Sequence, residues 1–198
     1  VIFIINKEYY ILESYNDYMT NQEFFNHINK SLIVSCQAVD NEPLNNKTAI
    51  TLMAKACIEG GAKTLRLSQV KHIKAIKKFI KKNNLNVPVI GIIKKRYPGS
   101  EVFITPTLGE VKQLLKLHVN VIALDATVRQ RPNESLEEIV KFIRTNYPDQ
   151  LIMADCADEQ DVLYADKLGF DIIGTTLRGY TQTTKGLNNI DNNFAFIK

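Results

Sequence analysis

The sequence predicts an α/β protein with a parallel sheet, and three observations carry that prediction. A pattern of strand followed by helix repeats six times after residue 31. One strand, 87–94, is a near-continuous run of Val and Ile too short for a helix, which is typical of a strand buried on both faces. Polar residues follow the strand ends, at the sheet edge that carries ligands and chemistry in such folds.

The expected strands are separated by amphipathic segments with recognisable helix ends. Thr20 and Ser135 each precede a Glu by three residues, which is capping-box spacing, and Gly60, Gly61 and Gly169 end two other helices. We expect strands at 32–36, 64–67, 87–94, 119–125, 151–155 and 170–175. We expect helices at 20–31, 47–59, 68–82, 107–117, 135–147 and 158–168, with the start of another at 194–198.

Lys94 ends the third strand and is the candidate catalytic residue. Apolar neighbours can lower the pKa of a buried amine, so that its neutral form becomes available for proton transfer or Schiff-base chemistry. The simpler alternative is a lysine that ends a strand and points into water. The sequence pattern alone leaves both readings open.

Six strand–helix units allow an open doubly wound sheet or a (β/α)8 barrel of which six units are present. The sequence contains no GxGxxG after the first strand and no GxxxxGK[ST], which removes the strongest support for a nucleotide fold. A barrel would gather the strand-end polar residues at one mouth, whereas an open sheet would spread them along an edge. Those residues are Gln37, Arg66, Lys94, Asp125, Asp155, Thr175 and Thr176.

Composition excludes several other classes of protein. The net charge of +4 is mild. The lysines of 71–82 alternate with apolar residues at helical spacing, so we expect them to form the solvent-exposed face of an amphipathic helix and not a nucleic-acid binding site. Cys36, Cys57 and Cys156 are widely spaced without a CxxC pattern, which suits a reducing cytoplasm and argues against zinc. No stretch is apolar and long enough to cross a membrane.

The first eighteen residues differ from the rest of the chain, because they are aromatic-rich and aperiodic and lack the features of a signal peptide. We therefore expect residues 1–18 to be a non-native upstream extension, with the native start at Met19. The barrel domain then spans 19–198.

Several segments together resemble one enzyme family in order and in spacing. They are SLIVSCQAVDNEPL, TLRLS, VPVIGIIKKRYPGSEVFITPT, VIALDATVRQRP, IMADCAD and GFDIIGTTLRGYT. From Met19 to Lys198 the chain is similar to bacterial N-acetylmannosamine-6-phosphate 2-epimerases of sialic acid catabolism. The resemblance implies a (β/α)8 TIM barrel that inverts C2 of an N-acetylhexosamine 6-phosphate through an enolate, without metal or cofactor.

The resemblance also assigns roles to residues of this chain. It implies that Lys94 is one of two proton-transfer groups, with a pKa lowered by burial and by cations such as Arg66. Gln37 and Arg66 match positions that contact substrate oxygens, and Asp125 matches one that binds sugar hydroxyls or orients the lysine. It further implies a cytoplasmic protein that is a homodimer when complete, acts on a small sugar phosphate, and binds neither nucleic acid nor membrane.

Each assignment has a structural alternative. Arg66 can pair with a carboxylate, and Asp125 and Asp155 can be N-caps or loop-ordering groups. Arg129 and Arg131 can order their own loop or bind the acidic substrate. Cys36 and Cys156 are expected to be packing residues. His27, His72 and His118 fall in or at the ends of helices, so metal chemistry of the ribulose-phosphate-epimerase kind has no ligands.

In the family, the second acid/base group is a glutamate at the end of strand seven, and the next loops bind phosphate. This chain is expected to be truncated before that strand and to lack both features. Two readings remain open: an epimerase whose activity resides in the intact protein, or a non-catalytic remnant that binds sugar phosphate weakly or associates with a full-length copy.

Overall fold

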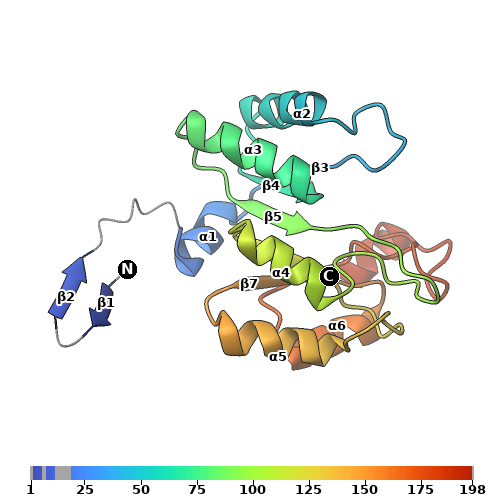
Figure 1. Ribbon diagram of the computed structural model, residues 1–198. Coiled ribbons are helices and arrows are strands. Elements are labelled where there is room, and N and C mark those ends of the chain that lie inside the picture. Colours follow the sequence, from blue (N-terminus) through green and yellow to red (C-terminus); the bar gives the residue numbers. More distant parts are fainter. Residues whose placement is uncertain (1, 6–7, 12–18, 198) are drawn as a thin grey trace.

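The computed structural model describes residues 2–5, 8–11 and 19–197, and its main element is a parallel sheet of six strands (Figure 1). The strands lie side by side in chain order, as expected for consecutive units of a (β/α)8 barrel. They are β3 (Ile33–Cys36), β4 (Thr64–Ser68), β5 (Val89–Ile92), β6 (Val121–Asp125), β7 (Leu151–Asp155) and β8 (Ile172–Gly174). The predicted α/β class and the six units are confirmed.

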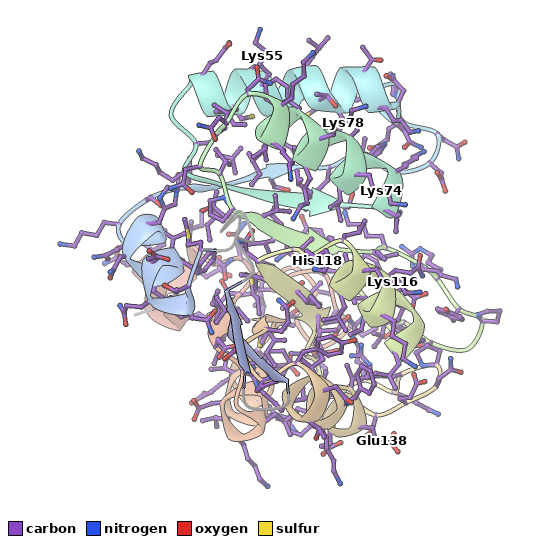
Figure 2. The ribbon with its side chains drawn as sticks, turned by 60° about the vertical axis from the view of Figure 1, so that its left-hand side comes forward. Lys55, Lys74, Lys78, Lys116, His118 and Glu138 are labelled. Carbon is purple, nitrogen blue, oxygen red and sulfur yellow. The ribbon has the colours of Figure 1, made fainter. Side chains whose placement is uncertain are left out.

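Helices connect successive strands and lie outside the sheet (Figure 1). They are α2 (Lys47–Glu59), α3 (Val70–Lys82), α4 (Leu108–Lys116), α5 (Leu136–Asn146) and α6 (Glu159–Leu168). The predicted capping boxes at Thr20 and Ser135 are both present, and Gly169 ends α6 in the left-handed conformation with φ of 78°. The charged face of α3 is exposed as predicted, with Lys74 and Lys78 labelled in Figure 2.

Alternation along the strands divides the core into two layers, because successive side chains of a strand point to opposite faces. Leu65, Leu67, Ile122 and Leu124 face the outer layer and pack against the helices. Ile90, Ile92, Val121, Ala123, Leu151 and Met153 face the inner layer. At the carboxyl ends of the strands, the positions that face the inner layer are occupied by Arg66, Lys94, Asp125 and Asp155. The alternation of side chains that builds the inner core therefore also places the polar candidates on the inner face.

Helix α1 (Asn21–Ile28) closes the amino-terminal end of the inner layer. Phe24 is 1% exposed and belongs to the inner cluster. The helix is held at two loops that precede strands: the Asn21 side chain donates to the carbonyl of Asp149, and the His27 ring bonds to the carbonyl of Lys63. The end of the sheet opposite the polar candidates is therefore sealed by an aromatic side chain.

Strands β5 and β6 separate towards their carboxyl ends, and the segment 102–105, here called the wedge, enters between them. Only Ile90 and Gly91 of β5 pair with β6. Beyond them Ile104 forms an antiparallel bridge with Lys94, and its carbonyl accepts the Asp125 amide at 3.1 Å. The sequence shows a short apolar segment here, but it does not predict the place of that segment in the sheet.

The two ends of the chain add small elements. Strands β1 (Ile2–Ile5) and β2 (Glu8–Ile11) pair antiparallel in a sheet of their own, which was not expected from the sequence. The proposed division at Met19 remains a prediction, and residues 1, 6–7 and 12–18 lie outside the described residues. Near the other end, α7 (Asp191–Phe194) and a 3-10 turn (Ala195–Ile197) stand where another helix was expected to start. Within the described residues, no helix is both long and apolar enough to cross a bilayer.

Replacing Phe24 should test the sealing role of α1. Phe24→Ala is expected to lower the free energy of unfolding by about 3–5 kcal/mol, because it leaves a cavity in the inner layer. Phe25→Ala is the matched control on the same helix: Phe25 is 37% exposed, so its loss should be much smaller. Urea unfolding midpoints of the two variants measure the difference, and equal losses would contradict the sealing role.

Candidate active site

Polar side chains gather at the carboxyl ends of the six parallel strands, as a barrel mouth requires. Arg66 and Asp155 lie inside β4 and at the end of β7, and Asp125 ends β6. Lys94 follows β5 by two residues and Gln37 follows β3 by one. Asp125 and Asp155 are register partners on neighbouring strands.

The strongest contact of the mouth is a buried ion pair between Arg66 and Asp155. Arg66 Nη1 and Nη2 donate to Asp155 Oδ1 and Oδ2 at 2.8 and 2.6 Å. Arg66 is 8% exposed and Asp155 is fully buried. Bidentate pairs of this kind fix both orientation and charge, and here the pair joins strands that are separated in the sheet by β5 and β6. The alternative that Arg66 pairs with a carboxylate is thus confirmed, and the pairing leaves other guanidinium donors available.

Lys94 is half-buried beside this pair, and its main chain is held on two sides. The wedge bonds to its neighbours, from the Thr105 amide to the Ile93 carbonyl and from the Lys95 amide to the Phe103 carbonyl. From the other side, Gln69 Nε2 donates to the Lys94 carbonyl at 3.1 Å. The lysine therefore stands on a fixed backbone.

The surroundings of Lys94 favour its neutral form. Burial lowers the pKa of the Lys94 ammonium, and the nearby Arg66 cation lowers it further. Two carboxylates act in the opposite direction, since Glu42 in the β3–α2 loop and Asp155 both raise this pKa. The net lowering matches the requirement for a lysine that takes up a proton as well as giving one.

Gln37 carries an unsatisfied acceptor at the mouth. Its Nε2 donates to Ser35 Oγ at 2.8 Å, whereas its Oε1 is buried and has no hydrogen-bond partner among the described residues. A buried amide oxygen without a donor costs free energy, so this atom is suited to accept a hydrogen bond from a bound molecule.

Asp125 directs its carboxylate to the loop that follows it. Oδ1 accepts from Thr127 Oγ1 at 2.7 Å, and Oδ2 accepts from Arg129 Nη2 at 2.7 Å. Burial raises the pKa of Asp125, while Arg129 and Thr127 offset part of that rise. Both contacts are made with the loop after β6. Asp155, in contrast, binds Arg66 and influences the charge of Lys94.

Arg131 orders the same region through backbone carbonyls. It is 8% exposed and donates to the carbonyls of Thr105, Pro106 and Asp125. The guanidinium thereby ties the wedge to the end of β6. The reading that Arg131 orders its loop is confirmed.

Two strand-end residues of the mouth, Asp155 and Thr176, received no site role from the sequence. The sequence leaves open an N-cap or loop-ordering role for Asp155, whereas the structure places it on the strand next to Asp125, in register with it, and pairs it with Arg66. Thr176 Oγ1 donates to Asp155 Oδ1 at 2.6 Å. The shared strand-end register of the two aspartates is the signal that could have found Asp155, whereas the partner of each polar group depends on how the sheet curls.

Cysteine and histidine take no part in this arrangement. Cys36 and Cys156 are buried in the outer layer, and burial raises the pKa of each thiol to about 12, so their reading as packing residues is confirmed. His27 and His72 lie in helices and His118 follows α4, as the sequence predicts. Across the described part of the chain, no group of three or more His, Cys, Asp or Glu side chains could hold a metal ion.

The fold and the mouth define a class: a parallel α/β barrel protein with a half-buried lysine and a buried Arg–Asp pair at the carboxyl ends of its strands. Residues 50–198 match the family model described as "Putative N-acetylmannosamine-6-phosphate epimerase". The chain therefore belongs to the N-acetylmannosamine-6-phosphate epimerase family.

Individual relatives agree with the family model. A protein of Malacoplasma penetrans with the corresponding 2-epimerase description is 60% identical over 171 residues, which cover 86% of this chain and 73% of the relative. A Listeria welshimeri relative is 49% identical and covers 86% of this chain and 71% of its own length. The solved N-acetylmannosamine-6-phosphate 2-epimerase of Clostridium perfringens is 40% identical with a TM-score of 0.79, over 88% of this chain and 74% of that one.

Arg131→Lys should destabilise the fold more than Arg129→Lys. A lysine cannot reproduce a guanidinium that serves three carbonyls, and each buried carbonyl left without a donor costs about 1–3 kcal/mol. Arg129→Lys retains a cation for the Asp125 carboxylate and loses only the bond from Arg129 Nε to Thr127, so its cost should be smaller. Denaturant titrations compare the two variants. A larger loss for Arg129→Lys would show that the side-chain pair, and not the backbone anchor, orders the loop.

Proposed function

We propose that this chain serves the interconversion of N-acetylmannosamine 6-phosphate and N-acetylglucosamine 6-phosphate, in which the proton on C2 is moved, and that it supplies the acid/base group of one face. In the open-chain sugar the C1 carbonyl acidifies the C2 hydrogen. A neutral amine takes that proton, giving an ammonium and an enolate; a second acid, which the family resemblance gives as a glutamate, then donates its proton to the opposite face of C2 and completes the inversion. The family membership of the chain and the names of its relatives support this substrate.

The observation that carries the proposal is the environment of Lys94. Proton transfer requires an amine whose neutral form is accessible, on a rigid element, in a polar mouth. Lys94 meets these conditions, because burial and Arg66 lower its pKa and the wedge and Gln69 hold its backbone. In our proposal Lys94 is the group that removes and returns the C2 proton on one face.

Arg66 and Gln37 are proposed to bind substrate oxygens. Arg66 has five N–H donors; Asp155 accepts two of them and Met153 Sδ accepts a third at 3.5 Å, so two remain for a carbonyl or enolate oxygen. A guanidinium in a buried site stabilises the negative charge that develops on an enolate oxygen. The buried Oε1 of Gln37 is an acceptor for a sugar hydroxyl or amide N–H.

Asp125 is proposed to orient Lys94 indirectly, through the loop after β6 that its carboxylate holds in place. Its bonds to Thr127 and Arg129 fix the first turn after β6, and its amide is bound to the wedge that also holds Lys94. This arrangement supports the expected role in orienting the lysine better than the role in binding sugar hydroxyls.

We further propose a homodimer as the working assembly and the cytoplasm as its location. All three cysteines are unpaired thiols in the structure, which suits a reducing compartment. Sedimentation of the purified chain tests the assembly, and a monomer at micromolar concentration would reject it.

Lys94→Met should abolish exchange with solvent of the C2 hydrogen in the epimer whose hydrogen faces Lys94. Exchange in deuterated water needs one base, whereas inversion needs a donor on each face, so exchange isolates the step assigned to Lys94. The expected loss is about 10²–10⁴-fold, which is typical for removal of a general base. Proton NMR of each epimer, measured separately, follows the C2 signal over time.

The matched control is Lys95→Met, which removes the adjacent lysine, an exposed residue bonded to Glu110 outside the proposed chemistry. It should retain the exchange rate of the parent chain. Exchange that persists in Lys94→Met on both epimers would overturn the assignment, and binding of sugar phosphate without exchange in the parent chain would favour a non-catalytic binding protein.

The pH profile should report the lowered pKa of Lys94. Because the neutral amine is the base, the exchange rate should rise with pH to a plateau, and the midpoint of the rise should lie below the 10.5 of an unperturbed lysine. Arg66→Gln removes the cation and leaves Asp155 to raise the pKa, so the midpoint of kcat/KM should move to higher pH. A midpoint that moves to lower pH would contradict the proposed electrostatics.

A further inference from the structure

Thr176 lies two residues beyond β8, and its hydroxyl reaches the carboxylate that holds Arg66. Thr176 Oγ1 donates to Asp155 Oδ1 at 2.6 Å, and the same oxygen accepts Arg66 Nη1 at 2.8 Å. Asp155 is in register with Gly174, so Thr176, two positions further on, falls on the same face of the sheet.

These bonds form a chain across the concave face of the sheet. It starts at Thr176 after β8, passes through Asp155 on β7 and ends at Arg66 on β4, beside Lys94. Asp155 accepts both contacts through a side chain that is fully buried. A carboxylate in this setting has its orientation set by its donors, because no water competes for its oxygens.

We propose that Thr176 is a positioning residue: its hydroxyl fixes the Asp155 carboxylate in the orientation that clamps Arg66, and thereby sets the charge around Lys94. The proposal rests on the function proposed for Lys94. Thr176 acts through Asp155 and needs no contact with the substrate.

The electrostatic consequence comes from the opposing signs around the lysine. Arg66 favours the neutral amine and Asp155 favours the ammonium. Without the Thr176 donor only Arg66 orients the carboxylate, and we expect the pair to shift together away from β8, which moves the Asp155 carboxylate away from Lys94. Moving a unit charge from about 5 to about 6 Å at an effective dielectric of about 20 changes a pKa by roughly 0.4 unit, downward for Lys94.

The test uses three substitutions in the full chain. Thr176→Val removes the hydroxyl and keeps the shape of the side chain, and Thr176→Ser restores the hydroxyl. Thr175→Val is the matched control on the preceding residue, which makes its described hydrogen bonds through its carbonyl. The thermal midpoint of each variant separates loss of folding from loss of positioning.

Two readouts are expected to change in Thr176→Val and to recover in Thr176→Ser. On the plateau above the Lys94 midpoint, where the amine is neutral in every variant, the exchange rate of the C2 hydrogen at saturating substrate should fall about tenfold with KM within about twofold, because Arg66 is held less firmly against the enolate oxygen. The midpoint of the Lys94 titration, followed by NMR of ¹³C-labelled lysine and assigned with Lys94→Met, should fall by roughly 0.4 unit. Thr175→Val should match the parent chain in both.

Each other outcome overturns the proposal. A Thr176→Val chain with the parent rate and titration shows that the hydroxyl positions nothing of consequence. A loss of rate that Thr176→Ser does not recover, or that Thr175→Val shares along with a lower thermal midpoint, identifies a packing role only. Because the titration needs no turnover, it decides the positioning role even where Lys94→Met shows that Lys94 is not the base.

Discussion

The ion pair between Arg66 and Asp155 is the interaction on which the mouth depends. It spans from β4 to β7 across the concave face and joins parts of the chain 89 residues apart. A buried pair repays its desolvation only when geometry is good and the remaining acceptors are satisfied, and here the contacts are bidentate with a further donor on the carboxylate. Loss of one partner alone would leave a buried charge, which is why the two side chains act as one structural unit.

The position of Lys94 depends on this pair and on the wedge together. The wedge fills the gap where β5 and β6 separate, so that the residue two beyond β5 is held as firmly as a residue within a strand. The pair supplies charges of both signs beside the amine. Backbone rigidity and local charge thus come from different elements, which allows the protein to fix the location of the amine and its proton affinity separately.

The sequence predicted the elements well and their partners less well, for physical reasons. Helix ends such as Thr20 and Ser135 are determined by residues three positions apart, so they can be read locally. Lys94, Arg66 and Asp125 could be placed at strand ends because parallel strands share a direction. The partner of each charged side chain could not be predicted, because it depends on tertiary structure. The curvature of the sheet brings Arg66 to Asp155, and the conformation of the following loop brings Arg129 to Asp125. The position of the wedge could not be predicted either, because a four-residue apolar segment could pack at many places in the fold.

The antiparallel bridge between Lys94 and Ile104 closes the base of the loop that connects them. Its outermost residues, Pro98 and Gly99, are exposed, and Gly99 has a φ of 78° in a turn. Since the bridge clamps the base of the loop, extra residues at the tip add only slowly growing loop-closure entropy and leave the base in place. This tip is therefore the natural point to insert a fluorophore tag or an affinity peptide close to the mouth without displacing the amine.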